Sequence, residues 1–221
     1  MQKEVILLRQ ETPADYRAVE ELTREAFWNH HVPGCDEHYL VHVMRSDAAF
    51  VPQLDYVALK DGKIVGNIMY TKCRIACDDG RKKEVLCFGP VSVLPQYQGQ
   101  GIGSLLIDHT KELARELGYD AILIYGDPDY YRRVQFVPAQ TFGIATADNM
   151  YADALLALEL IPGALQNCAG RFEEASVYTL DAEKSKVFNQ TFTSKPMLEG
   201  LPTQERFSYL VGRRTPRTPL Q

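Results

Sequence analysis

Three glycines fall close together in Gly99-Gln100-Gly101-Ile102-Gly103, directly before a stretch whose apolar residues recur at helical spacing. Glycine lets the backbone approach a ligand closely, and the first amides of a helix have no partner within it. Together with the positive end of the helix dipole, such amides bind phosphate groups. The segment therefore predicts a site for a cofactor that carries a pyrophosphate.

Two common phosphate-binding patterns fit this segment poorly. A dinucleotide-binding fingerprint needs Gly-x-Gly-x-x-Gly or Ala directly after a strand. Here Ser104 stands at the last position, and Leu94–Gln98 separates the glycines from the preceding strand. A nucleotide-hydrolase loop needs Gly-Lys-Ser/Thr after its glycines, and no lysine stands there. Both of these cofactor classes are therefore disfavoured.

The segment does resemble the cofactor-binding motif of the GCN5-related N-acetyltransferase (GNAT) superfamily. That motif reads Gln/Arg-x-x-Gly-x-Gly/Ala after a strand that ends in Val-x-Val-x-Pro. Gln98, Gly101 and Gly103 fill its key positions, and its lead-in is filled by Val91, Val93 and Pro95. The resemblance implies acetyl-CoA as cosubstrate. The residues that it implies for cofactor binding are Val91, Ser92, Val93, Gln98, Gly99, Gln100, Gly101, Ile102, Gly103 and Ser104.

The resemblance continues downstream. Gly126–Phe136 is similar to the family's second signature, a tyrosine on a short helix shortly before Gly-Phe, and Tyr131 holds the position of the usual general acid. Gln135 stands where the family has glycine, so the local backbone is expected to differ there. Ala157–Leu165 resembles the C-terminal part of the YhbS-like predicted N-acetyltransferase subgroup, and the likeness covers roughly residues 4–180.

The resemblance implies direct acetyl transfer to a primary amine in a ternary complex. A lysine-like amine has a pKa of about 10.4, so it must lose a proton before it attacks. Tyr131 is expected to protonate the leaving thiolate. Glu84 and water are the two candidate bases. A backbone amide near Val91–Val93 is expected to stabilise the oxyanion. Pro90 cannot donate to a neighbouring strand, so Gly89-Pro90 could mark the point where this strand leaves its neighbour and its backbone groups become free to bond the cofactor's amides. The alternative is a proline at a simple strand edge.

The segment from Trp28 onward stands where the superfamily builds its acceptor pocket. Its mixture of aromatic, amide and acidic groups makes Trp28, His31 and Asp36 candidates for binding the acceptor amine, and a solvated polar loop is the alternative. Tyr125 and Tyr130 are expected to be packing residues rather than catalysts.

The histidines and cysteines raise the question of a metal. Four of the five histidines lie in the same loop and helix, and Cys35, His38 and His42 have helical spacings that could bring ligands to one face. Surface histidines explain the same pattern. Cys73 and Cys77 lie ~13 Å apart along an expected strand and cannot clamp one ion. We therefore expect no metal site.

The elements that must position these residues follow from periodicity. Strands are expected at Val5–Arg9, Leu54–Lys60, Ile64–Cys77, Glu84–Val93, Tyr119–Tyr125, Leu156–Leu160 and Ser176–Leu180, and helices at Thr12–Phe27, Asp36–Arg45 and Ile102–Leu117. Asp61-Gly62 predicts a hairpin, and the strand, helix and strand around the glycines require a parallel pair. The expected fold is α+β and GNAT-like, with a central mixed antiparallel and parallel sheet flanked by helices and a C-terminal extension.

Length and composition agree with this organisation. The chain has 221 residues, of which 45% are apolar and 24% charged, which is typical of globular proteins. We expect an acetyltransferase domain at residues 1–180, with its cofactor-binding core at about 50–138, and an extension of unknown role at 181–221. The end of that extension, Arg213–Pro219, is expected to be a loose polar tail.

The formal net charge of −5 gives no reason to expect nucleic acid or an anionic membrane as a partner. The scattered cysteines and the absence of an apolar run of ~18–20 residues favour the cytoplasm. The expected partner is a small-molecule or protein amine. The oligomeric state is open, and a homodimer is compatible with the sequence. The alternative function is a non-catalytic, regulatory acyl-CoA-binding module.

Overall fold

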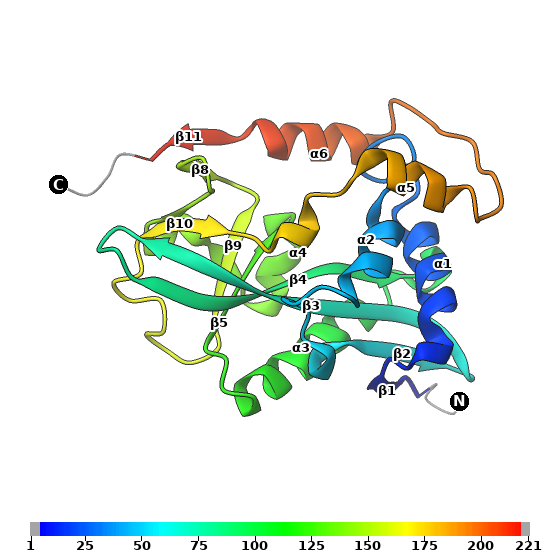
Figure 1. Ribbon diagram of the computed structural model, residues 1–221, viewed down its shortest axis with the longest axis horizontal. Coiled ribbons are helices and arrows are strands. Elements are labelled where there is room, and N and C mark those ends of the chain that lie inside the picture. The colour runs from blue at the N-terminus through cyan, green and yellow to red at the C-terminus, as the bar shows by residue number, and fades with distance from the viewer. Residues whose placement is uncertain (1–4, 218–221) are drawn as a thin grey trace. The chain divides into compact units, whose positions relative to one another are not determined.

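Strands and helices follow the sequence periodicities over most of residues 5–217, which are the residues that the computed structural model describes (Figure 1). The strands are β1 (Leu7–Gln10), β2 (Tyr56–Lys60), β3 (Lys63–Cys77), β4 (Lys82–Val93), β5 (Ala121–Tyr125), β6 (Val137–Pro138), β7 (Ile144–Ala145), β8 (Met150–Ala152), β9 (Leu155–Glu159), β10 (Gly170–Glu173) and β11 (Arg214–Pro216). The helices are α1 (Tyr16–Phe27), α2 (Glu37–Met44), α3 (Ile102–Glu116), α4 (Pro128–Tyr131), α5 (Ala182–Asn189) and α6 (Pro202–Gly212).

The chain divides into two units, each assembled from separate segments. The first unit takes in the chain up to Tyr70 together with Gly89–Thr110 and Ser176–Glu205. The second takes in Thr71–Phe88, Lys111–Ala175 and the chain from Arg206 onward. Strands β3 and β4 and helix α3 therefore contribute residues to both units, and so does the expected C-terminal extension.

The strands of the first unit follow the order β1-β2-β3-β4. β1 pairs antiparallel with β2, and β2 pairs antiparallel with β3, in registers that place Leu7 opposite Leu59 and Tyr56 opposite Ile68. Asp61 and Gly62 both have positive φ, 50° and 77°, as a tight hairpin turn of the predicted kind requires. The predicted hairpin is therefore confirmed.

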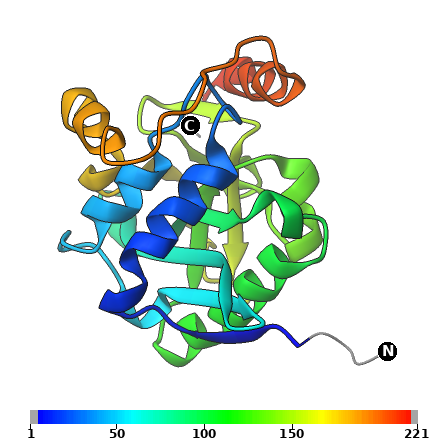
Figure 2. The same ribbon diagram turned by 90° about the vertical axis from the view of Figure 1, so that its right-hand side faces the viewer.

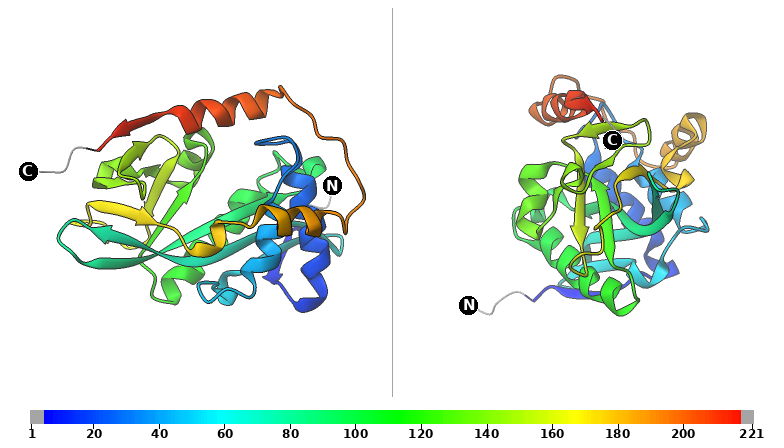
Figure 3. Two further views of the ribbon diagram at one scale, coloured as in Figure 1. Left: turned by 45° about the horizontal axis from the view of Figure 1, so that its top comes forward. Right: turned by 90° about the vertical axis from the view of Figure 1, so that its left-hand side faces the viewer.

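Helices α1 and α2 pack against each other in the first unit (Figure 2). A short 3-10 turn at Pro13–Asp15 precedes α1, where the Asp15 carboxylate accepts a hydrogen bond from the Thr12 backbone amide at 2.9 Å. Helix α5 lies beside α2 in the ribbon (Figure 3). The ring of His38 on α2 stacks on the ring of Phe188 on α5, with ring centroids 5.7 Å apart. These contacts attach the first part of the C-terminal extension to the amino-terminal helices.

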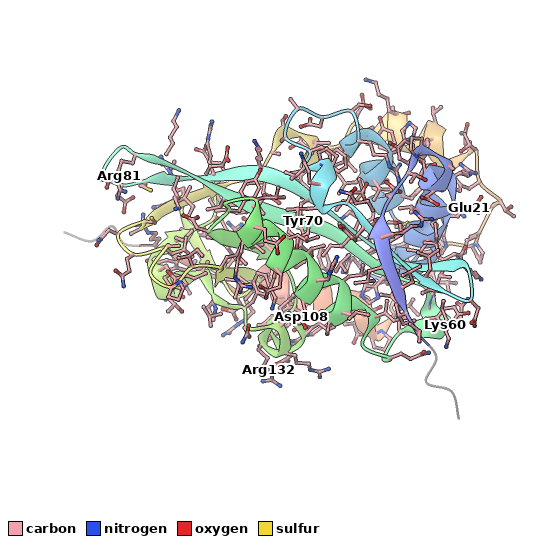
Figure 4. All side chains as sticks on the ribbon, turned by 90° about the horizontal axis from the view of Figure 1, so that it is seen from below. Glu21, Lys60, Tyr70, Arg81, Asp108 and Arg132 are labelled. Carbon is pink, nitrogen blue, oxygen red and sulfur yellow. The ribbon has the colours of Figure 1, made fainter. Side chains whose placement is uncertain are left out.

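Helix α3 packs closely on β3 because Gly66 has no side chain. A Cβ added there would meet Ile102 and Leu106 of α3 at 3.1 Å. Further along β3 stands Tyr70, which is labelled in Figure 4. The hydroxyls of Tyr70 and Thr110 form a buried hydrogen bond at 2.8 Å. This packing fixes the start of α3, which directly follows the glycine-rich segment.

The strands of the second unit follow the order β3-β4-β5-β9-β6, and β10 pairs with β3. β4 and β5 are parallel, with Leu86 opposite Ile122, as the strand-helix-strand order predicted. β5 and β9 are antiparallel along the whole of β5. The sheet is therefore mixed, and the predicted fold class is confirmed.

Large, fully buried apolar side chains form the core of each unit. Those of the first unit include Met44, Leu54, Ile68, Met69, Leu106 and Ile107. Those of the second unit include Ile75, Leu86, Ile122, Leu123 and Phe172. No helix within residues 5–217 is long and apolar enough to cross a membrane.

Two predictions near the C-terminus are wrong. Ser176–Leu180 does not form a strand, because Ser176–Tyr178 closes a 3-10 turn in which the Thr179 amide donates to the Ser176 carbonyl at 3.0 Å. The nearby strand is β10, whose pairing with β3 is a non-local feature.

The expected loose tail at Arg213–Pro219 is also ordered where the structure describes it. Arg214–Pro216 pairs with β8, and the Arg217 guanidinium donates to the Asp78 carboxylate at 3.0 Å. Thr218 and Pro219 lie outside the described residues. Backbone pairing and a buried guanidinium thus anchor a polar segment whose composition alone indicates a loop.

Candidate active site

The glycine-rich segment of the first unit presents backbone amides at the start of α3. Gly99 and Gly101 have φ of 73° and 82°, and no atom lies within 4 Å of where a Cβ would stand at either position. The Leu105 amide donates to the Gly101 carbonyl at 2.9 Å. The amides of Ile102, Gly103 and Ser104 precede it and have no carbonyl to bond within the helix. This arrangement suits an anionic group.

The side chains around these amides hold the segment in place. Gln98 donates to the Val93 carbonyl at 3.0 Å, and Gln100 donates to the Gln96 carbonyl at 3.1 Å. The buried Ser92 hydroxyl donates to Thr23 at 3.1 Å. The ten predicted cofactor residues thus lie together at the end of β4 and the start of α3, and their glutamines stabilise the turn.

Tyr131 lies in the second unit, at the end of α4. Its ring contacts Phe88 and Phe136, with ring centroids 5.9 and 5.7 Å away. Gly126 is essential to this packing, because a Cβ there would overlap the Tyr131 ring. The half-buried phenol is therefore held by apolar neighbours against the chain that leaves β5.

Helix α4 has only one turn, and Asp127 and Arg206 hold it. The Asp127 carboxylate caps the helix by accepting from the Asp129 amide at 2.9 Å. Arg206 of α6 donates to both oxygens of Asp127, each at 2.8 Å, and to Asp129 at 2.8 Å. The guanidinium holds the pKa of Asp127 below its ordinary value. Sequence reasoning missed Arg206, because its partners lie about 80 residues away.

Gln135 follows the helical turn that succeeds Tyr131, and its φ is 74°. This is the left-handed conformation that glycine adopts without strain. The chain thus keeps the turn that a glycine would make, although the residue type differs.

Glu84 also lies in the second unit, exposed at the start of β4. Leu86 of the same strand pairs with Ile122 near the start of β5, whereas the Tyr131 ring lies against Gly126, beyond the end of β5. A strand advances ~3.3 Å per residue, so Glu84 and the Tyr131 ring are roughly 15–20 Å apart along the strand direction. The role of Glu84 as a base stays a prediction that the geometry does not support.

The predicted acceptor residues lie in the first unit, and two of them line one small cavity. Trp28 and Asp36 belong to the wall of a cavity of about 150 Å³, whereas His31 lies outside it and contacts Glu37 at 3.2 Å. The Trp28 indole donates to the Pro196 carbonyl at 2.9 Å, and Asp36 accepts from the Ser185 hydroxyl. Their polar groups are therefore occupied within the protein.

The same region holds the histidines and cysteine that raised the metal question. His42 contacts Glu20 at 2.8 Å, and the Cys35 sulfur lies 3.5 Å from His38 Nδ1. Burial raises the pKa of Cys35 to about 12 and lowers the pKa of His38 to about 4. Across residues 5–217 no three His, Cys, Asp or Glu side chains are grouped to hold a metal ion.

A larger cavity, of about 360 Å³, lies in the second unit. Tyr125 lines it, together with apolar side chains of α6 and a pair formed by Arg214 and Asp148 at 2.5 Å. Sequence reasoning missed this cavity, because its wall combines residues of β5, the β7–β9 region and the C-terminal segment.

A family model and two curated proteins match parts of the chain that run through both units. The family model described as the acetyltransferase (GNAT) family matches residues 16–139. The uncharacterized N-acetyltransferase YjhQ of Escherichia coli K12 is 33% identical over 100 residues, which are 45% of this chain and 54% of YjhQ. The uncharacterized N-acetyltransferase YhbS of the same strain is 29% identical over 132 residues, which are 59% of this chain and 73% of YhbS.

Solved structures extend the similarity to most of the fold. The Escherichia coli YhbS structure in complex with CoA superposes with a TM-score of 0.72 at 25% identity, covering 81% of this chain and 95% of that one. A GNAT-family acetyltransferase of Brucella melitensis in complex with acetyl-CoA gives 0.63 at 26% identity, covering 80% and 99%.

Proposed function

This chain belongs to the acetyltransferase (GNAT) family, and from that premise we propose that it transfers the acetyl group of acetyl-CoA directly to a primary amine. The observation that carries the proposal is the open turn at Gly99 and Gly101, which leaves the first amides of α3 available for the cofactor's pyrophosphate. The relatives whose structures contain CoA and acetyl-CoA support the same cosubstrate.

The proposed roles follow from the chemistry of acyl transfer. The neutral amine attacks the thioester carbon, and an amide of Val91–Val93 stabilises the resulting oxyanion. The C–S bond then breaks, and Tyr131 donates its proton to the CoA thiolate. A phenol with a pKa of about 10 is a suitable donor for a thiolate whose conjugate acid has a pKa near 8.5. Trp28, His31 and Asp36 remain candidates for contacts with the acceptor.

The alternative, a non-catalytic acyl-CoA-binding module, accounts for the amides of α3 but not for Tyr131. Such a module has no need for a phenol held by Phe88, Phe136 and a clamped helix. The enzyme is therefore the better supported function. A cytoplasmic location and a homodimer stay predictions.

The test is amine-dependent release of CoA thiol from acetyl-CoA, measured with a panel of primary amines. Tyr131→Phe is expected to lower kcat by about 100-fold, the lower end of the usual contribution of a general acid. Tyr130→Phe, which removes the hydroxyl of the neighbouring tyrosine, should stay within 2-fold of the wild type, on the order of the usual small effect of a surface change.

CoA binding is measured separately by thermal stabilisation. CoA at 100 times its Kd should stabilise the wild type and Tyr131→Phe alike, by about 2.7 kcal/mol. Stabilisation without turnover of any amine would favour the non-catalytic module. The absence of any shift with CoA would exclude both functions.

A further inference from the structure

A row of polar side chains crosses the second unit from β10 to β5. In the pairing of β10 with β3, Phe172 lies opposite Ile75 and Glu173 opposite Arg74, so Glu174 arrives next to Cys73. The Ala175 amide donates to the Cys73 sulfur at 3.3 Å. The backbone is thus fixed on both sides of Glu174, by the strand pairing before it and by this hydrogen bond after it.

The Glu174 carboxyl differs from most carboxyls in the second unit. Its neighbour Glu173 is paired with Arg74 at 2.5 Å, whereas within residues 5–217 the carboxyl of Glu174 has neither a hydrogen bond nor an ion pair. The side chain is exposed, yet surrounding protein atoms desolvate it and raise its pKa to about 7. Glu174 therefore combines access to solvent with a raised pKa, a combination that suits a group that exchanges protons near neutral pH.

Two titratable groups lie close enough to Glu174 to interact with it electrostatically, Cys73 of β3 and Tyr125 of β5. The Cys73 thiol interacts electrostatically with Glu174. A hydrogen bond with Cys87 lowers the pKa of Cys73. The Tyr125 phenol also interacts with Glu174, and burial raises its pKa above the ordinary value, with Glu174 adding to the effect. Tyr125 therefore stays protonated at neutral pH and can donate a hydrogen bond.

Tyr125, which interacts with Glu174, also lines the cavity of about 360 Å³. The walls of that cavity are mainly apolar, and their apolar members are Ala147, Ala152, Ala154, Leu210 and Val211. Arg214 and Asp148 pair with each other there and so leave no net charge in its wall. The cavity therefore suits an uncharged, mainly apolar body.

The same end of β5 carries the general acid. Gly126 follows Tyr125, and the Tyr131 ring lies against Gly126. Tyr125 also contacts Phe172 at 6.1 Å between ring centroids, two residues before Glu174. Glu174 thus interacts with Tyr125, the residue directly before the glycine against which the Tyr131 ring lies. The reaction needs both a group that removes a proton and a group that donates one.

We propose that Glu174 is the catalytic base, and that the acceptor is a primary amine on a mainly apolar body that lies in the cavity beside Tyr125. This inference rests on the proposed acetyl transfer. The Glu174 carboxylate takes a proton from the ammonium, and the neutral nitrogen forms the C–N bond. The C–S bond breaks, the thiolate takes the Tyr131 proton, and the second amine proton returns through water to Tyr131. Glu174 then releases its proton to solvent.

The first test compares Glu174→Gln with Glu173→Gln, using acetyl-CoA and phenethylamine or hexylamine, with spermidine as the polar comparison. The wild-type kcat/KM should rise with pH through about 7 and then level off, because the base must be ionised. In Glu174→Gln it should fall about 100-fold at pH 7.5, without that rise and with an unchanged KM for acetyl-CoA. Glu173→Gln should stay within about 2-fold of the wild type.

A wild-type pH profile in Glu174→Gln would overturn the assignment of the base. A lower KM for spermidine than for both apolar amines would overturn the proposed acceptor class. The same conclusion would follow if neither apolar amine reacted or bound while CoA still stabilised the protein. If CoA did not stabilise the protein, the proposed acetyl transfer itself would be contradicted.

A second readout does not depend on activity. A carboxyl whose pKa is raised in the folded state keeps its proton there at pH values where the unfolded chain has lost it, so the folded state loses stability as pH rises from about 4.5 to about 7. Glu174→Gln should therefore raise Tm at pH 8 relative to the wild type and change it less at pH 5. An equal shift at both pH values would contradict the assigned desolvation of Glu174.

Discussion

The two cavities of this protein differ in how their polar groups are used. In the cavity of the first unit, Trp28 and Asp36 already bond to Pro196 and Ser185. In the larger cavity of the second unit, Arg214 and Asp148 are paired, but the Tyr125 side chain in its wall interacts electrostatically with Glu174. The Glu174 carboxyl has no hydrogen-bond or ion-pair partner within residues 5–217. Polar groups that bind a substrate must exchange water for that substrate, whereas groups already bonded internally hold the fold. Residue type therefore identified candidates, but the partners of each group distinguish the two cavities.

Among variants that compare the two cavities, the largest effect should come from placing a bulky side chain in one cavity and, separately, in the other. Ala154→Leu places a bulky side chain in the cavity beside Tyr125 and should raise KM for phenethylamine by about 50-fold, within the range known for added methylenes in a pocket. Ala182→Leu makes the same change in the cavity beside Trp28 and should leave that KM within about 2-fold. Steady-state kinetics at saturating acetyl-CoA measures both. A larger increase in KM for Ala182→Leu than for Ala154→Leu would indicate that the acceptor binds in the cavity of the first unit.

Loss of the hydrogen bonds between Arg206 and the start of α4 should have the next largest effect. Arg206→Ala frees Asp127 and Asp129, so Tyr131 loses its fixed position and kcat should fall about 10-fold. Stability should change by less than about 1 kcal/mol, because the ion pair is partly exposed. Arg213→Ala, which removes an exposed pair with Asp153, is the matched control. Equal kcat in the two variants would show that α4 does not depend on Arg206.

A smaller effect should be confined to stability in the first unit. Asp36→Asn weakens the hydrogen bond with Ser185 and should lower the free energy of unfolding by about 1 kcal/mol. KM for the amine should stay within about 2-fold, since Asp36 is bonded internally. Denaturant unfolding and steady-state kinetics separate the two outcomes. A large increase in KM with unchanged stability would restore Asp36 as an acceptor ligand.

The smallest effect concerns the backbone after Tyr131. Gln135→Gly relieves a left-handed conformation but adds entropy to the unfolded chain, so the net gain should be about 0.5 kcal/mol. Chemical denaturation measures the gain, and kcat should not change. A drop in kcat would show that the strained residue helps to fix the second unit's site.

Local patterns determined what could be predicted from the sequence. The Asp61-Gly62 hairpin, the start of α1 and the glycine turn before α3 each depend on adjacent residues, and all three are present as predicted. The parallel pairing of β4 with β5 followed from the order of elements.

The remainder depends on contacts between distant residues. β10 exists because it pairs with β3, about 95 residues earlier, and nothing in its own four residues indicates a strand. Arg206 and Glu174 gain their proposed roles from neighbours that are distant in sequence, so composition and spacing gave no signal for them. The strand predicted at Ser176–Leu180 was wrong for the same reason, since its alternating residues had no strand to pair with.

The segment from Arg206 to Arg217 has a consequence for how this enzyme could diversify. One short stretch clamps α4 through Arg206, supplies Leu210, Val211 and Arg214 to the cavity wall, and is anchored to Asp78 by Arg217. The glycine turn that we propose as the cofactor site contains none of the residues of this stretch. Exchange of this stretch between homologues is therefore a route to new acceptor preferences that leaves affinity for acetyl-CoA intact.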